Sequence, residues 1–153
     1  MIDSKTSRPT ITDGEILSQI IIHAAKQKRK SRSTAKCLYR ENLTPNCPIR
    51  CFVGIFIDDD DYSINLESCW AANIADNLKY NFTDTQLRLL NKCQQIHDTN
   101  NVSDWADMLV RTIKINQLSI SKEAKDALNV LADLHPVCVN QIKAQIATIP
   151  TYE

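Results

Sequence analysis

Apolar residues first recur at helical spacing just after residue 11. The segment T-D-G-E, which starts at Thr12, is a capping-box pattern in which Thr12 and Glu15 satisfy each other's backbone donors. A helix starting there places its apolar positions on one stripe, and the basic run 26–32 follows at its end. The positions expected in that stripe are Ile16, Leu17, Ile20, Ile21 and Ala24.

The pattern from residue 66 onward predicts four further helices. One covers 67–80, a second starts at the capping box of Thr83, a third is capped by Ser103, and a fourth runs from Ser121 towards Pro136. A last short helix would use Val139, Ile142 and Ile146. The other positions expected to be buried are Trp70, Ile74, Leu78, Leu87, Leu90, Cys93 and His97, or Leu89 and Ile96 beside them, then Trp105, Met108, Leu109, Thr112, Ile113, Ala124, Ala127, Leu128, Leu131 and Leu134.

Residues 33–65 are the least helical part of the chain. Pro45 and Pro48 interrupt any helix there, and the run C-F-V-G-I-F-I has the composition of a strand. Only two glycines occur in 153 residues, which argues against a turn-rich all-β fold. We therefore expect a mainly α fold, with α+β as the alternative: about five helices around one core, and a small strand or irregular segment at 35–57. Residues 1–11 are expected to form a flexible tail, and 12–153 a single domain.

Charge gives this chain no overall attraction to polyanions. Lysine plus arginine and aspartate plus glutamate number 18 each, so that any electrostatic contact must come from a local patch. The N-terminal residues lack the apolar core of a secretory signal, and no apolar run is long enough to span a bilayer. We therefore expect a cytoplasmic protein without a membrane partner, whose six cysteines stay reduced.

Cysteine spacing raises a metal hypothesis. Cys47 and Cys51 are separated by three residues, a spacing found in zinc ligand pairs, and Cys37 or His97 could complete a set of four. The second close pair that structural zinc sites usually show is missing from the sequence. The pattern favours no metal and no cofactor, with these four residues as the alternative.

Cysteine catalysis is a second hypothesis. Cys51 as nucleophile, His97 as base and Asp98 as orienting group supply the residue types of a hydrolase or transferase. Adjacent residues on a helix point about 100° apart, so Asp98 can orient the imidazole only if the helix ends there. The apolar surroundings of Cys51 predict a raised thiol pKa. We therefore expect these residues to be structural, and the protein to bind rather than catalyse.

Two charged segments are candidate binding surfaces. The positive charges of the basic run are expected to interact favourably with the negative C-terminal end of the dipole of the helix before it. Alternatively, they contact nucleic acid. The acidic run 58–61 is expected to hold Arg40 in a bidentate pair, and Gly54 is expected to allow close backbone approach. The opposite signs could also pair within one molecule or between two copies in a homodimer. The candidate binding residues are Lys26, Lys28, Arg29, Lys30, Arg32, Arg40, Asp58, Asp59, Asp60, Asp61 and Tyr62.

Several short motifs occur in an order that resembles a family of small phage and prophage proteins. They are C-L-Y-R from Cys37, C-F-V-G from Cys51, an acidic stretch ending at Tyr62, Q-Q-I-H-D at 94–98 and S-D-W at 103–105. The resemblance as a whole extends over about residues 37–118. The chain departs from the family pattern in a longer loop before Cys51 and in Asp58-Asp59 where the family has Pro-Asp. The resemblance implies a mobile-element accessory protein that binds a host protein, inhibiting a host defence system.

Overall fold

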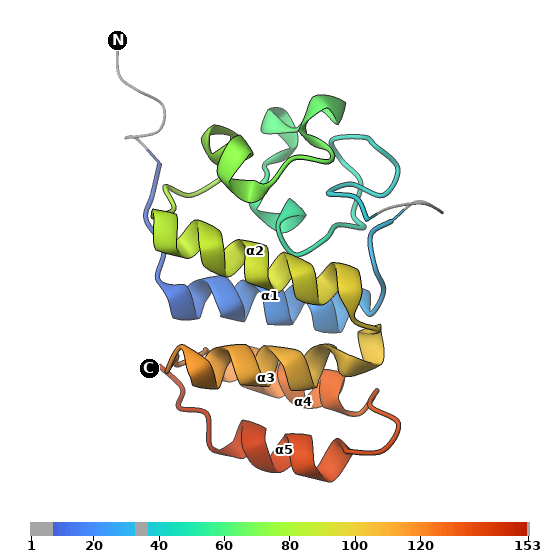
Figure 1. Cartoon of the computed structure of the whole chain (residues 1–153), viewed down its shortest axis with the longest axis vertical. Coiled ribbons are helices and arrows are strands. Elements are labelled where there is room, and N and C mark those ends of the chain that lie inside the picture. The colour runs from blue at the N-terminus through green and yellow to red at the C-terminus, as the bar shows by residue number, and fades with distance from the viewer. Residues whose placement is uncertain (1–7, 33–36, 153) are drawn as a thin grey trace. The chain divides into compact units, whose positions relative to one another are not determined.

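The chain folds mainly into helices, which confirms the predicted fold class (Figure 1). The computed structural model describes residues 8–32 and 37–152. They form two compact units: unit 1 consists of Met1–Ile11 and Lys30–Asp98, and unit 2 of Thr12–Arg29 and Thr99–Glu153. The single domain expected over 12–153 stays a prediction. The α-helices of the described residues are α1 (Asp13–Gln27), α2 (Asp84–Thr99), α3 (Trp105–Ile115), α4 (Lys122–Ala132) and α5 (Val139–Ala147).

Unit 2 is a helical bundle in which α4 packs against α1, α3 and α5. The capping box at Thr12 forms as predicted, since Thr12 Oγ1 accepts from the Glu15 N–H while the Glu15 carboxylate accepts from the Thr12 N–H. Ser121 caps α4 by accepting from the Ala124 N–H at 3.0 Å. The five apolar residues expected in the stripe of α1 are all buried, so the helical spacing located this part of the core.

The C-terminal segment of unit 2 is joined to α1 through Ser18. The Ser18 hydroxyl accepts from the Ser121 N–H at 2.9 Å and lies 3.1 Å from the Tyr152 hydroxyl. A Cβ placed on Gly14 would lie 2.2 Å from the carbonyl oxygen of Ser119, so this approach of α1 to the loop before α4 requires glycine.

Unit 1 consists of α2 and a series of short 3₁₀ turns, which Figure 1 shows gathered on one side of that helix. The second capping box also forms, since Thr83 Oγ1 accepts from the Gln86 N–H and the Gln86 side chain accepts from the Thr83 N–H. Phe56, Tyr80 and Phe82 meet edge to face with ring centroids 5.4–6.1 Å apart. The turns of unit 1 are Gly54–Phe56, Asp59–Asp61, Ile64–Leu66 and Ala71–Asn77.

The α-helix predicted over 67–80 is wrong. Ser68 has a φ of 69°, and Ile74 is non-helical inside the 3₁₀ turn Ala71–Asn77. The side chain of Glu67 accepts hydrogen bonds from backbone N–H groups of Tyr39 and Arg40, which fixes it outside a helix. Tertiary hydrogen bonds therefore outweigh the apolar spacing here: Ile74 and Leu78 are buried as expected, whereas Trp70 is 62% exposed.

The segment 37–57 is irregular, which was one of the two predicted alternatives, and residues 35–36 lie outside the described part. No strand forms among the described residues, and the pairing near this segment is limited to isolated bridges such as Arg40 with Arg50. A Cβ on Gly54 would lie 2.4 Å from the carbonyl oxygen of Tyr39, which confirms the predicted close approach. This close approach brings the backbone at Gly54 next to that of Tyr39, the residue before Arg40.

Two expectations at the ends of elements need correction. Ser103 does not cap α3, because it lies within a 3₁₀ turn, Val102–Asp104, through which the chain enters the helix. Residues 8–11 are also not a loose tail: Arg8 donates to carbonyl oxygens of Ala75 and Asp76, and the carbonyl oxygen of Ile11 accepts from Gln86 at 2.6 Å. The rest of the expected tail, residues 1–7, lies outside the described residues.

No helix in the described part of the chain combines the length and apolar character that crossing a bilayer requires.

Candidate functional site

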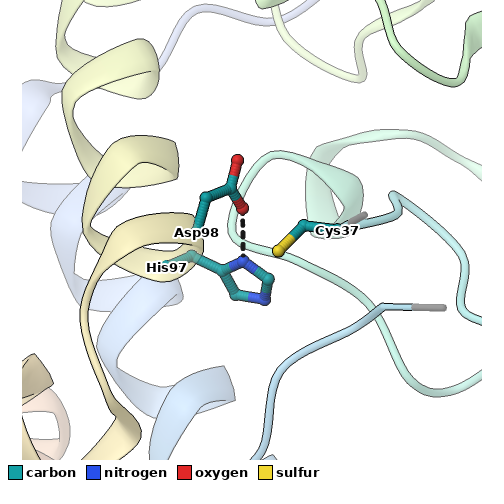
Figure 2. Close-up of side chains that lie close together, drawn as sticks. All are labelled: Cys37, His97 and Asp98. Carbon is teal, nitrogen blue, oxygen red and sulfur yellow. Dashed lines mark hydrogen bonds and ion pairs between the residues drawn. The ribbon is translucent and has the colours of Figure 1, made fainter. Parts of the chain in front are cut away.

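A cysteine, a histidine and an aspartate converge near the end of α2. Figure 2 shows Cys37 beside His97 and Asp98, and one potential ligand atom from each lies within 4.8 Å of the others. The helix ends at Thr99, so the Asp98 side chain can turn back to its neighbour, and its Oδ1 lies 2.7 Å from His97 Nδ1. We expected Asp98 to orient the His97 imidazole only if the helix ended near these residues. The helix does end there, and the contact between Asp98 and His97 is present.

Both ring nitrogens of His97 are hydrogen-bonded inside unit 1. Nε2 accepts from the backbone N–H of Ser31 at 3.2 Å, and because an amide nitrogen can only donate, the ring proton must lie on Nδ1. Nδ1–H then donates to Asp98, and the fully buried ring packs edge to face on Phe52. This is the arrangement of a neutral histidine that fixes the backbone, since neither nitrogen is left to remove a proton from a substrate.

The thiol beside this pair belongs to Cys37. Burial raises its pKa to about 11, and the charge of Asp98 and a hydrogen bond to that carboxylate act in the same direction. A thiol with this pKa is protonated at neutral pH and is a poor nucleophile. The Cys37–His97–Asp98 cluster therefore works as a network of hydrogen bonds within unit 1.

The same three side chains are the ligand types that zinc takes. A metal on Nδ1 would displace the hydrogen bond to Asp98 and move the ring proton to Nε2, where it would face the N–H of Ser31. Two donors would then oppose each other in a buried position, at a cost of about 1–3 kcal/mol. The hydrogen-bond pattern thus fits a protonated network better than a metal site.

Cys51 and Cys47 are held elsewhere. Cys51 is fully buried, its Sγ accepts from the Gly54 N–H at 3.3 Å, and burial raises its pKa far above neutral. The Cys47 thiol donates to the carbonyl oxygen of Ile49 at 3.5 Å. Of the predicted metal ligands, the described structure thus groups only Cys37 and His97, and the burial of Cys51 counts against a nucleophilic role.

Arg40 is buried instead of presenting a binding surface. Its guanidinium donates to the carbonyl oxygens of Gly54 and Ile57 at 2.6 and 2.5 Å, and its Nε to that of Pro45 at 3.2 Å. Asp59 lies 3.6 Å away, so backbone carbonyls take the place of the expected bidentate carboxylate. The ring of Tyr62, also buried, lies under the guanidinium at 5.1 Å.

The acidic residues 58–61 form the short 3₁₀ turn Asp59–Asp61 and its N-cap, Asp58. Asp59 pairs with Arg50 at 2.8 Å, while the side chains of Asp58, Asp60 and Asp61 are exposed. Among the candidate binding residues of this run, Asp59 is therefore committed to an internal ion pair, and the other three remain available to solvent.

The basic run divides between the two units. Lys26, Lys28 and Arg29 are exposed at the end of α1 in unit 2, where Lys28 forms the left-handed cap. In unit 1, Lys30 donates to the carbonyl oxygen of Asp98 at 3.2 Å, and Arg32 is exposed. The expected pairing of Lys26 with the helix dipole fits its place in the last turn of α1.

A cavity of about 180 Å³ lies beside the Cys37–His97–Asp98 cluster in unit 1, and Cys37 and Asp98 both line it. Its lining residues include the acids Glu67 and Asp98, the amide residues Asn91 and Gln94, and Trp70. Glu67 is fixed by the Tyr39 and Arg40 N–H groups and by the Tyr62 hydroxyl, which donates to it at 2.8 Å. The pocket thus has positioned acidic groups and one largely exposed indole.

Glu67 and Trp70 were not predicted as site residues, because both fall in the helix predicted over 67–80. The predicted nucleophile was Cys51 instead of Cys37, since no local spacing links Cys37 to a histidine sixty residues further along the chain. The only available signal was the motif order itself, in which C-L-Y-R and Q-Q-I-H-D both occur. Comparison of the chain with protein-family models, characterised proteins and solved structures finds no match.

Proposed function

We propose that this protein is a non-catalytic accessory protein of phage or mobile-element type, which binds a host protein through the pocket of unit 1 and inhibits a host defence system. The observation that supports binding is Trp70, whose side chain is 62% exposed while it lines the pocket. Exposed tryptophan is costly in water and is among the residues that contribute most energy to protein interfaces. The phage-type part of the proposal rests on the motif resemblance.

The state of the reactive side chains supports binding over catalysis. The Cys37 thiol is held protonated next to Asp98, Cys51 is fully buried, and both nitrogens of His97 are engaged. A cysteine enzyme needs a thiolate and a base that can exchange its proton. Of these three residues, only Cys37 lines the pocket.

The test is affinity capture from a bacterial host lysate, with the bound proteins identified by mass spectrometry. The wild-type chain should enrich one host protein reproducibly, and Trp70→Ala should lose it while keeping the wild-type circular dichroism spectrum. Ile115→Ala is the matched control, because Ile115 is 81% exposed but lies in unit 2. Equal capture by the Trp70 variant would contradict binding at this pocket.

Inhibition of a defence system needs a separate measurement. The cells used should express the defence system to which the captured host protein belongs. They should become more sensitive to phage when the wild-type chain is co-expressed. The Trp70→Ala variant should leave them resistant, because it removes the contact that supports binding. An equal increase in sensitivity with both variants would contradict inhibition through this pocket.

A further inference from the structure

The pocket of unit 1 carries negative charge on its wall. Glu67 and Asp98 both line it, and its described lining residues include no lysine, arginine or histidine. Asp98 contacts the imidazole of His97, which does not line the pocket, and the ammonium of Lys30 binds the backbone carbonyl oxygen of Asp98 instead of its carboxylate. A group that enters this pocket would meet two carboxylates and would be favoured if it carried positive charge.

The carboxylates are already positioned before any ligand enters. Glu67 accepts three hydrogen bonds, from two backbone N–H groups and the Tyr62 hydroxyl. Asp98 Oδ1 accepts from His97 Nδ1 and, at 2.7 Å, from the Gln94 amide. Groups fixed in this way lose little conformational entropy on binding, so their charge is available to a ligand at low cost.

Trp70 narrows the choice of cation. An indole face attracts a cation that is placed over it, and arginine does so more often than lysine because its planar guanidinium is more weakly hydrated. A guanidinium can also donate two parallel hydrogen bonds to one carboxylate, which an ammonium cannot. The combination of carboxylates with an exposed indole therefore matches arginine best.

The size of the cavity fits one side chain. Pockets that enclose drug-sized ligands and cofactors measure about 300–1,000 Å³, larger than the 180 Å³ found here. Resting on the proposed function, we infer that this pocket receives an arginine side chain of the partner protein, with its guanidinium between the carboxylates of Glu67 and Asp98 and the indole of Trp70.

The test uses small probes and the full chain. N-acetylarginine amide is titrated into the ¹⁵N-labelled protein, and its effect is compared with that of N-acetylcitrulline amide, which has nearly the same shape but no charge. Arginine should shift the Trp70 indole N–H and the side-chain amides of Asn91 and Gln94 saturably. Citrulline should bind about tenfold more weakly or worse, because a charged hydrogen bond is lost.

Two variants assign the binding to this pocket. Asp98→Asn removes the charge but keeps an oxygen that can accept from His97, and it should weaken arginine binding about tenfold. Asp60→Asn makes the same change on an exposed acid of the turn Asp59–Asp61 and should leave binding unchanged. Trp70→Ala, which alters an exposed side chain, should weaken binding as well and guards against a folding defect in the Asp98 variant.

The inference is overturned if arginine gives no saturable shifts at these positions, if citrulline binds equally, or if Asp60→Asn weakens binding as much as Asp98→Asn does. Failure of the proposed function gives a different result. If a host protein is captured in a Trp70-dependent way but the arginine probe does not bind, only the inference fails. If the probe binds as expected and no host protein is captured, the arginine site stands and the proposed function fails.

Discussion

Individual side chains in unit 1 take structural roles that their chemistry alone would not assign. Arg40 is a charged residue with no exposed surface, and it satisfies three backbone carbonyl oxygens that the irregular segment leaves unpaired. His97 similarly fixes the backbone of Ser31. The three bonds of Arg40 take the place of regular hydrogen bonds that a helix or sheet would have supplied between residues 37 and 57.

Replacing Arg40 with alanine should lower the free energy of unfolding by about 3 kcal/mol or more, because each buried acceptor left unsatisfied costs about 1–3 kcal/mol. Arg40→Lys should also destabilise, since an ammonium cannot reproduce the planar fork. The measurement is the urea midpoint of each variant. Arg88→Ala changes an exposed arginine on α2 and should shift it little; equal midpoints for all three would contradict this role of Arg40.

Cys37 should be alkylated slowly at neutral pH, because its pKa is raised to about 11 by burial and then by Asp98. The thiolate forms only as pH rises towards that value, so the alkylation rate should increase about tenfold for each pH unit between 8 and 10. Asp98→Asn removes one of the causes that raise the pKa and should speed alkylation at pH 8. Peptide mass spectrometry after timed iodoacetamide treatment gives the rates, and a pH-independent rate would contradict the assignment.

Secondary-structure elements were predictable where their signals are local. The caps of α1, α2 and α4 lie within three residues of the groups they bind, so the sequence pattern around Thr12, Thr83 and Ser121 located all three. The segment 67–80 was not predictable in this way. Its conformation depends on Glu67 binding backbone groups at residues 39 and 40, and no pattern within the segment records contacts so distant in the chain.

In the candidate site, too, the contacts between neighbouring residues were predictable and those between distant segments were not. The pairing of His97 with Asp98 depends on where α2 ends, which the polar residues after it indicated. The pocket depends instead on the fold of 67–71 against residues 37–39, and it could not be read from either segment alone.

Glu67→Ala should destabilise unit 1 by about 1.5–3 kcal/mol or more, because a single hydrogen bond to a charged group contributes that much and three donors would lose their acceptor. Hydrogen exchange should rise at the Tyr39 and Arg40 amides before it rises in α2. Asp126→Ala, on an exposed position of α4, is the control and should leave those amides unchanged. Unchanged exchange at Tyr39 in the Glu67 variant would disprove the role of this carboxylate.

The whole molecule is built from discontinuous pieces of chain. Unit 1 takes its residues from two segments and unit 2 from two others, and the chain passes from one unit to the other at 11–12, 29–30 and 98–99. Most of the residues of unit 1 therefore lie between α1 and its packing partner α4 in the sequence.

A chain that ends at Asp98 should therefore lose hydrogen-exchange protection in α1, because α4 is removed while the buried face of α1 remains. The segments of unit 1 are all present in that chain, so peptides from α2 serve as the internal control and should keep most of their protection. Mass spectrometry of exchanged peptides measures both. Full protection of α1 in the shortened chain would show that α4 is not required.

This interleaving has a consequence for synthesis on the ribosome. About one hundred residues separate the start of α1 from that of α4, and at about 5–20 residues per second the first helix waits about 5–20 s for its partner. During that interval α1, whose five apolar stripe residues are buried in the folded chain, lacks the helix against which it packs. The nascent chain thus presents a hydrophobic helix of the kind that chaperones bind, and its yield in cells should depend on them.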